Sequence, residues 1–144
     1  MGLIGKLAGH RVYFDTNIFI YAFEATARYR LQLEALAKLL DDESCVAFTS
    51  EFTLAELLTK PFRDNMLRAV AGYRDMLEDS TIRLAPVTRG VLIRSAMLRG
   101  QLGMKTPDAI HVATAVDSGC GVFLTNDSAI RLPKSLELVL FSDR

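Results

Sequence analysis

Short apolar runs rich in β-branched and aromatic residues alternate along the chain with segments whose apolar residues recur at helical spacing. Runs of the first kind predict buried strands, and segments of the second kind predict helices packed against them. The expected strands are residues 11–14, 45–48, 82–87, 122–125 and 136–141. Pro86 cannot donate to a strand ladder, so the third strand is expected at an edge. This alternation favours an α/β fold, with one parallel sheet covered by helices on both faces.

Recognisable residues mark the ends of the helices expected between these strands. The expected helices are residues 18–24, 29–40, 50–58, 66–77, 91–102 and 106–118. Lys60-Pro61 is expected to end the third helix, because proline cannot continue the hydrogen-bond ladder. Gly103 is expected to end the fifth. Thr106 is expected to be the N-cap of the sixth, with Pro107 in its first turn.

The composition is that of one soluble globular domain covering residues 1–144. Lys plus Arg and Asp plus Glu number 17 each, so the overall charge gives no sign of a polyanionic partner. No stretch approaches the roughly 18 apolar residues that span a bilayer, so we expect a cytoplasmic protein without a membrane segment. Cys45 and Cys120 lack metal-ligand spacing and are expected to be buried free thiols.

Four acidic residues follow or flank the expected strands on the side where strands end and helices begin. They are Asp15, Glu56, Asp108 and Asp127. Asp15 ends the first strand, and Asp127 lies just beyond the fourth. Asp108 opens a helix that runs back along the sheet, so it starts at the same edge. Because ligands of open α/β sheets bind at the carboxyl ends of the strands, the four acids are predicted to converge there.

A carboxylate cluster repels itself and contributes nothing to packing, so it indicates a bound divalent cation. Two carboxylates about 4 Å apart repel by roughly 4 kcal/mol at an effective dielectric near 20, and at least one is expected to have a raised pKa without metal. Mg²⁺ or Mn²⁺ suits oxygen ligands, for which we select Asp15, Asp108 and Asp127. Glu56 then ligates the cation or positions the attacking water. The pattern predicts a metal-dependent enzyme acting on phosphate esters.

Several polar residues near these acids are candidates for supporting roles. Asn17 and Thr125 are placed to orient a ligating carboxylate through hydrogen bonds. Basic side chains that could meet substrate phosphates, or simply be solvated, are those of Lys60, Lys105 and Arg131. His111 is interpreted as a hydrogen-bonded structural residue, because hard cations prefer oxygen to nitrogen. Each acid taken singly also has an ordinary explanation, as a helix cap, a turn residue or a solvated side chain.

Four segments, in this order, resemble the PIN domain and are most similar to VapC-type toxins of toxin–antitoxin pairs. They are Phe14-Asp15-Thr16-Asn17, Leu54-Ala55-Glu56-Leu57-Leu58, the segment from Pro107 to Ala115, and Leu124-Thr125-Asn126-Asp127. The resemblance implies a single-domain PIN fold with a flavodoxin-like, five-stranded parallel sheet. It also implies a Mg²⁺- or Mn²⁺-dependent endoribonuclease with RNA as substrate. About ten residues precede the first strand, where many such toxins begin almost directly with it.

The same resemblance assigns roles to particular residues and implies partners. It maps the acidic site onto Asp15, Glu56, Asp108 and Asp127, and the supporting polar positions onto Asn17 and Thr125. A homodimer is implied, together with a cognate antitoxin that inserts a segment beside the acids and blocks them.

Other functions remain as alternatives. A PIN nuclease of RNA maturation would use the same residues, and a binding-only PIN domain would have no need to retain all four acids. A phosphatase of the haloacid dehalogenase type also has an aspartate after its first strand, but requires a second acid where this chain has Asn17. A phosphate-accepting receiver domain would need further acids beside Asp15. Phosphate transfer onto Asp15 from a small donor would distinguish these last two from a nuclease.

Overall fold

The computed structural model describes residues 2–79 and 81–142. The strands are β1 (Arg11–Phe14), β2 (Val46–Ser50), β3 (Ile82–Ala85), β4 (Val122–Thr125) and β5 (Glu137–Leu140). The helices are α1 (Leu3–Leu7), α2 (Thr16–Glu24), the 3-10 turn η1 (Ala27–Tyr29), α3 (Arg30–Asp41), α4 (Phe52–Arg63), α5 (Leu67–Leu77), α6 (Arg89–Leu102) and α7 (Thr106–Asp117). Every expected strand and helix is present.

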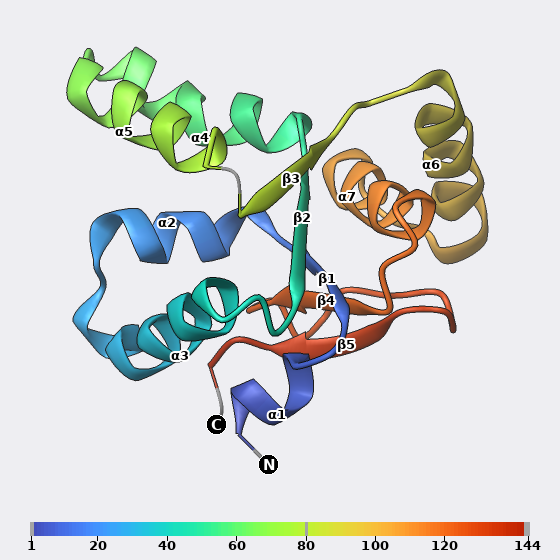
Figure 1. Cartoon of the computed structure of the whole chain (residues 1–144). Helices are drawn as coiled ribbons and strands as arrows, with labels where there is room; N and C mark the ends of the chain where they lie inside the picture. The colour runs from blue at the N-terminus through green and yellow to red at the C-terminus, as the bar shows by residue number, and fades with distance from the viewer. Residues whose placement is uncertain (1, 80, 143–144) are drawn as a thin grey trace.

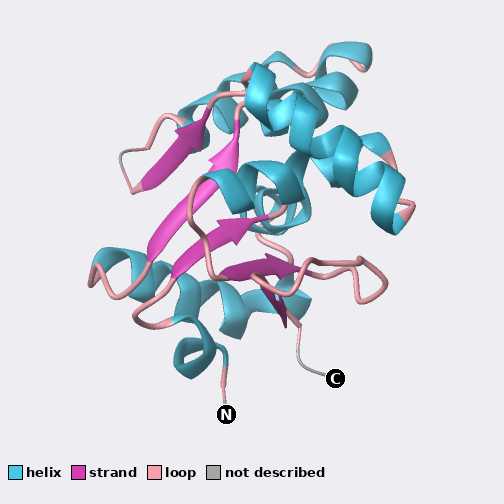
Figure 2. Ribbon diagram, turned by 90° about the vertical axis from the view of Figure 1, so that its right-hand side faces the viewer, coloured by secondary structure: helices cyan, strands magenta, loops and turns pink. Residues whose placement is uncertain are grey.

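The five strands form one sheet in the order β3-β2-β1-β4-β5, and every neighbouring pair is parallel. Figure 2 shows the strands side by side between layers of helices. The α/β fold class and the edge position of the third strand are confirmed. The strand order differs from the 2-1-3-4-5 of flavodoxin itself, so the likeness lies in the layers and the strand directions. The winding reverses between β1 and β4, which makes their carboxyl ends the expected ligand site.

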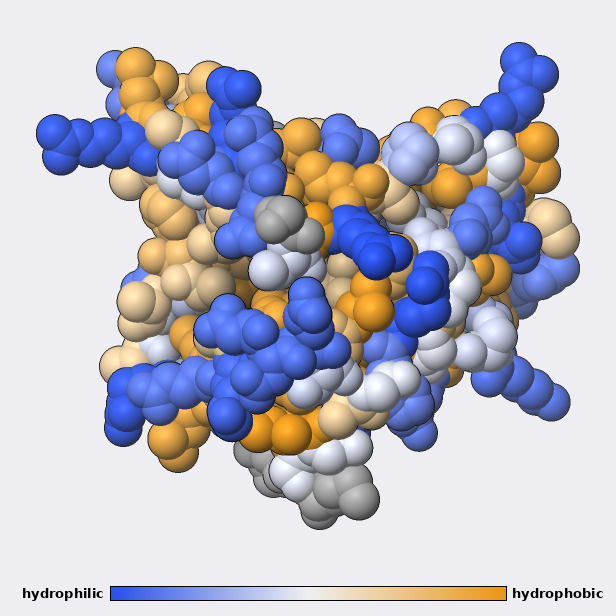
Figure 3. Space-filling view, viewed as in Figure 1, coloured by the Kyte–Doolittle hydropathy of each residue, from blue (hydrophilic) through white to orange (hydrophobic). Residues whose placement is uncertain are grey.

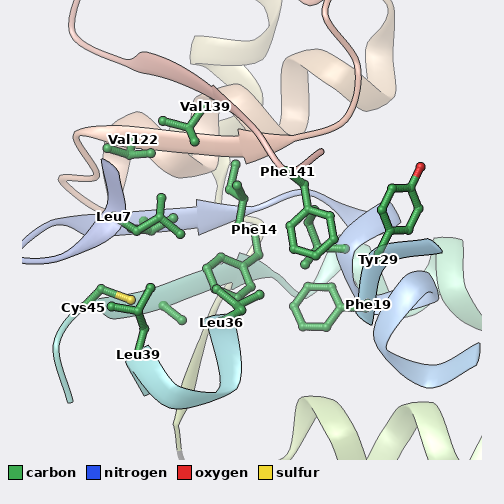
Figure 4. Close-up of a cluster of buried hydrophobic side chains, with 14 of the residues drawn as sticks. Leu7, Phe14, Phe19, Tyr29, Leu36, Leu39, Cys45, Val122, Val139 and Phe141 are labelled. Carbon is green, nitrogen blue, oxygen red and sulfur yellow. The ribbon is translucent and has the colours of Figure 1, made fainter. Parts of the chain in front are cut away.

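Alternate residues of β1 face the two sides of the sheet and supply two cores. Val12 and Phe14 pack on one side with α1, α2, α3 and α5, whereas Tyr13 packs on the other with α6 and α7. In Figure 4, Phe14 lies among Phe19, Leu36 and Phe141. Because the central strands β1, β2 and β4 are covered on both sides, their residues are buried almost without interruption rather than alternately.

The residues before the first strand form α1, which packs on α3 close to the two termini (Figure 1). Its Leu7 is fully buried in the same core as Cys45 and Leu39. Gly9 has a φ of 80° and turns the chain from α1 into β1. The extra N-terminal segment is therefore part of the core.

Two helix boundaries differ from the expectation. Pro61 does not end α4, which continues to Arg63, and the chain leaves the helix at Asn65 with a φ of 54°. The proline is buried near the last turn, where its missing N–H costs one hydrogen bond and its ring packs. Thr106 is not the N-cap of α7, because Lys105 takes that position with extended backbone angles and makes no side-chain cap. Gly103 ends α6 as expected, with a φ of 68°.

Two smaller expectations can also be compared with the structure. Cys45 and Cys120 are both buried and free, as predicted. Burial raises the pKa of Cys120 to about 12, so its thiol stays protonated at neutral pH. Among the helices of residues 2–79 and 81–142, none has the length and apolar character needed to cross a bilayer.

Candidate active site

Asp15 lies at the carboxyl end of β1, where it caps α2. Its Oδ1 accepts a hydrogen bond from the backbone N–H of Thr16 at 2.8 Å, and its Oδ2 accepts one from the Thr125 hydroxyl at 2.7 Å. Thr125 ends β4 and is fully buried. Its Oγ1 also accepts from the backbone N–H of Asp127 at 3.1 Å and from Asn17 Nδ2 at 3.4 Å. The Thr125 hydroxyl therefore connects the carboxyl ends of β1 and β4, the two strands that meet at the switch point.

Asp108 and Asp127 line the same cleft, between the start of α7 and the loop that follows β4. The cleft has a volume of about 240 Å³, and Lys105 and Arg131 line it with the two acids. Arg131 Nη1 donates to the carbonyl oxygen of Leu102 at 3.3 Å, which holds its guanidinium at the wall. Of the three basic residues selected from the sequence, these two lie beside the acids, whereas Lys60 does not line the cleft.

The charges of neighbouring acids act on Asp108. Burial raises the pKa of Asp108, and the negative charges of Asp15 and Asp127 raise it further. The positive charge of a protonated His111 would oppose them without reversing the shift, and Glu56 adds a smaller rise. The charges of the other three acids therefore all act on Asp108. The raised pKa is what a carboxylate cluster without a compensating cation is expected to have.

Glu56 is held at the rim of this group by two hydrogen bonds to one of its oxygens. Its Oε1 accepts from the Thr16 hydroxyl at 2.6 Å and from His111 Nε2 at 2.5 Å. Burial alone would raise the pKa of Glu56, but the hydrogen bonds from His111 and Thr16, with the positive charge of His111 when its ring is protonated, outweigh it and lower the pKa. Glu56 is consequently ionised at neutral pH.

His111 has a larger part in the site than the sequence indicated. The residue is 2% exposed, and its Nδ1 lies 2.6 Å from the hydroxyl oxygen of Tyr13. Burial raises the pKa of Tyr13 well above its ordinary value, with further rises from Asp15 and Glu56. The expectation of a hydrogen-bonded histidine is confirmed, but one of its partners is a candidate catalytic acid. The spacing of three residues from Asp108 was the only sequence signal, and nothing in the sequence pointed to Tyr13.

The donor set fits a hard divalent cation. Asp15, Asp108 and Asp127 offer carboxylate oxygens from three different elements, and the buried Oδ1 of Asn17 has no hydrogen-bond partner among the described residues. Within residues 2–79 and 81–142, no three His, Cys, Asp or Glu side chains are grouped so that they could hold a metal ion. Asp15 and Asp127 instead accept local hydrogen bonds, as Asp127 Oδ1 does from the backbone N–H of Ala129 at 3.0 Å. Binding therefore requires these side chains to exchange local donors for the cation.

A second, apolar hollow lies on the face seen in Figure 3, between α2 and α3, with its apolar floor in orange and charged side chains around it. Its volume is about 670 Å³. Ala22, Leu33, Ala37 and Leu40 contribute to its wall, Leu36 of α3 contributes to both the wall and the core, and Leu39 faces the core alone. The wide apolar face expected over residues 29–40 therefore serves both the core and this groove, which we call the α2–α3 groove.

Comparison with known families matches the PIN domain to residues 12–134 of the chain. Among solved structures, a toxin–antitoxin complex from Klebsiella pneumoniae is similar, with a TM-score of 0.64 and 22% identity over 88% of this chain and 95% of that one. VapBC2 from Rickettsia felis, bound to a DNA fragment from its promoter, gives a TM-score of 0.69 and 20% identity over 90% and 97%. At these identities the likeness concerns the fold. No curated protein matches the sequence significantly.

Proposed function

The chain belongs to the PIN-domain family, and on that premise we propose that it is a Mg²⁺- or Mn²⁺-dependent endoribonuclease acting as the toxin of a toxin–antitoxin pair. The observation that carries the proposal is the placement of Asp15, Asp108 and Asp127, which come from three separate parts of the chain: Thr125 bonds both Asp15 and the Asp127 backbone, and Asp108 and Asp127 line one cleft. Such a cluster opposes folding unless it serves a cation. Its position at the β1–β4 switch point is where α/β enzymes bind their ligands.

In this mechanism the three aspartates hold the cation and Glu56 positions the attacking water. The chemistry that Mg²⁺ or Mn²⁺ supplies when bound is polarisation of a phosphoryl oxygen and a lower pKa of nearby water. Thr125 keeps Asp15 oriented through its 2.7 Å hydrogen bond. Glu56 is ionised and keeps Oε2 free of hydrogen bonds to other described residues, so this oxygen is available to accept one from water.

Lys105 and Arg131 are proposed to bind the phosphates of the RNA that flank the scissile bond. They line the same cleft as Asp108 and Asp127, so a phosphate held by them lies next to the acids. The chain carries 17 basic and 17 acidic residues and so has no net positive charge, but these two basic side chains provide positive charge at the cleft itself. Charge at the cleft matters for binding a phosphodiester, whereas the sum over the whole surface does not.

A solved toxin–antitoxin complex has a similar fold, and we propose the α2–α3 groove as the surface on which an antitoxin docks, because the groove is lined mainly by apolar side chains. Charged side chains at its rim, among them Arg30, Glu34 and Asp41, would fix the register of an apolar segment laid into it. Ala37→Glu should weaken copurification with a coexpressed antitoxin and leave RNA cleavage unchanged. Ala71→Glu, an exposed alanine on α5, is the matched control and should alter neither. Equal binding by both variants would place the partner elsewhere.

A homodimer is proposed through the outer face of α6. Ile93 and Met97 are 57% and 52% exposed, on the side of the helix opposite to the buried Val91 and Leu98. Exposed apolar side chains at this spacing are typical of an interface between chains. Sedimentation over a concentration series should give a dimer for the wild type and a monomer for Ile93→Glu. A wild-type monomer at every concentration would refute the dimer without affecting the nuclease.

The nuclease itself is tested by cleavage of RNA with purified protein. Asp15→Asn and Asp127→Asn should each abolish cleavage with the fold intact, as judged by circular dichroism. Chelator should stop cleavage by the wild type, and added Mg²⁺ or Mn²⁺ should restore it. Cleavage that persists in either variant, or that is indifferent to chelator, would refute the mechanism.

The biological role has its own test, because a toxin and an RNA-maturation nuclease share the same chemistry. Expression of the wild-type chain in a bacterial host should arrest growth, and coexpression of the antitoxin should relieve the arrest. Cleavage in the tube without growth arrest would favour the maturation role. Both roles imply action in the cytoplasm. Neither the phosphatase nor the receiver alternative gains support from the site, which has no second acid at position 17.

A further inference from the structure

A buried hydrogen-bonded chain connects the interior of the protein to Glu56. It begins at the Tyr13 hydroxyl, which lies 2.6 Å from His111 Nδ1, and continues from His111 Nε2 to Glu56 Oε1 at 2.5 Å. Tyr13 is fully buried and the His111 side chain is 3% exposed, whereas the Glu56 side chain is 30% exposed. The chain thus runs from a dry, packed interior to an acid at the rim of the candidate site.

The donors and acceptors allow one arrangement of protons for a neutral imidazole. A carboxylate can only accept, so the ring nitrogen that faces Glu56 must carry its proton. His111 Nε2–H therefore donates to Glu56, which leaves Nδ1 without a proton. Nδ1 then accepts, and the Tyr13 hydroxyl donates to it. The tyrosine thus selects the tautomer that can hold the glutamate.

Packing keeps the imidazole in this orientation. The rings of Tyr13 and Phe52 lie edge-on to His111, with centroids 5.8 Å and 5.6 Å away. Phe123 stacks on Tyr13 at 5.2 Å and holds that ring in turn. A freely rotating imidazole could not orient the Glu56 carboxylate, but the rings of Tyr13 and Phe52 keep the His111 ring from rotating.

Glu56 needs such a restraint more than the aspartates do. Its side chain projects from α4 and has three rotatable bonds, so without restraint it would extend into solvent in many conformations. The hydrogen bonds from Thr16 and His111 both go to Oε1. No described residue donates to Oε2, so this oxygen is fixed in place and left unoccupied by protein donors. A purely structural histidine would be satisfied equally well by backbone carbonyls.

We propose that His111, with its tautomer set by Tyr13, is a positioning residue that holds the Glu56 carboxylate in its working orientation. This inference rests on the proposed nuclease function, in which Glu56 positions water. It assigns to two buried residues an effect on the reaction rate, although neither touches the substrate.

The first test is kinetic. Tyr13→Phe and His111→Leu should lower kcat for RNA cleavage by about tenfold or more, the range found when residues that orient a functional group are removed, with KM nearly unchanged. His111→Gln retains an N–H donor near the position of Nε2 and should recover most of the lost rate. Tyr73→Phe, a buried tyrosine on the opposite face of the sheet, is the matched control and should cleave like the wild type.

A double-mutant cycle separates positioning from general destabilisation. Tyr13→Phe should lower the rate in the wild-type background and have little further effect on the residual rate of Glu56→Gln, because the carboxylate it acts through is already gone. Equal losses of rate in both backgrounds would mean that the Tyr13–His111–Glu56 hydrogen bonds act on stability alone, and would overturn the proposal. Full activity of Tyr13→Phe and His111→Leu in a wild type that cleaves RNA would overturn it as well.

A spectroscopic test does not depend on cleavage. The nitrogen-15 shifts of the His111 ring in the full-length, metal-free protein should show a protonated Nε2 and an unprotonated Nδ1, and Tyr13→Phe should shift the ring toward a mixture of tautomers. The opposite tautomer in the wild type, or an unaltered His111 ring in Tyr13→Phe, would refute the proposed hydrogen bonding from Tyr13 to His111. If the expected spectra were found in a protein that cleaves no RNA, the proposed nuclease function would fail. The positioning role of His111 would fail with it, but the hydrogen-bonded chain from Tyr13 to Glu56 would stand.

Discussion

The replacement Asp108→Asn should make the metal-free protein more stable at neutral pH. The pKa of Asp108 is raised by burial and by the charges of Asp15 and Asp127, so the folded chain holds this proton more tightly than the unfolded chain does. Between the two pKa values the folded state binds more protons, and stability falls as the pH rises through that interval. At a pH above the folded pKa, Asp108 is charged in both states and the full loss of folding stability remains. Asparagine is nearly the same size, has no charge to lose and avoids that penalty.

The size of the gain is limited by solvent. Asp108 is only partly buried, so screening keeps the benefit to roughly 1 kcal/mol or less. For a chain of this length, this corresponds to a rise of about 3 °C or less in Tm. The gain should vanish at acidic pH, where Asp108 is protonated in both the folded and the unfolded wild type.

Thermal unfolding followed by circular dichroism, in chelator and across a pH series, measures this difference. With saturating Mn²⁺ the order should reverse, because only the wild type retains all three ligands and gains the free energy of binding. Asp75→Asn, an exposed aspartate on α5, is the matched control and should change little at any pH. If Asp108→Asn were no more stable than the wild type in chelator at neutral pH, the acids would not repel one another as reasoned here.

Three further changes test particular contacts by urea unfolding. Thr125→Val removes the buried hydroxyl that donates to Asp15 and should cost about 2 kcal/mol, whereas Thr125→Ser should cost clearly less; a larger loss for Thr125→Ser would mean that the methyl group matters more than the hydrogen bond. Leu7→Ala should cost about 2–5 kcal/mol because Leu7 is fully buried, and a negligible loss would show that α1 is dispensable. Gly103→Ala should cost about 1 kcal/mol because Gly103 has a φ of 68°, and a gain in stability would contradict that backbone strain.

The fold was largely predictable because its strands are buried on both faces. Four-residue runs such as Val122–Thr125 stand out from the amphipathic helices around them, and their alternation leaves few topologies. Helix ends were harder to predict. Pro61 is tolerated inside α4 because it packs in the core, and Lys105 caps α7 through its backbone conformation alone. Both outcomes depend on tertiary packing, which local propensity does not contain.

The site was predictable only as far as topology determines it. Strand direction predicts that Asp15, Asp108 and Asp127 lie at one edge of the sheet, and it accounts for the place of Thr125 beside Asp15. The chain from Tyr13 through His111 to Glu56 does not, because it depends on side-chain rotamers of three elements that are far apart in sequence. A buried strand tyrosine looks like any other core residue until its hydroxyl is seen to face a histidine.

The central claim is that aspartates from three distant segments hold one cation site. Crystals soaked in Mn²⁺ and measured at the manganese absorption edge test it most directly, because the anomalous signal locates the ion without assumptions about activity. We predict a peak bonded to Asp15 and to at least one of Asp108 and Asp127, and no such peak in Asp15→Asn crystals. Strong Mn²⁺ peaks confined to other parts of the surface, with none at these carboxylates, would contradict the account.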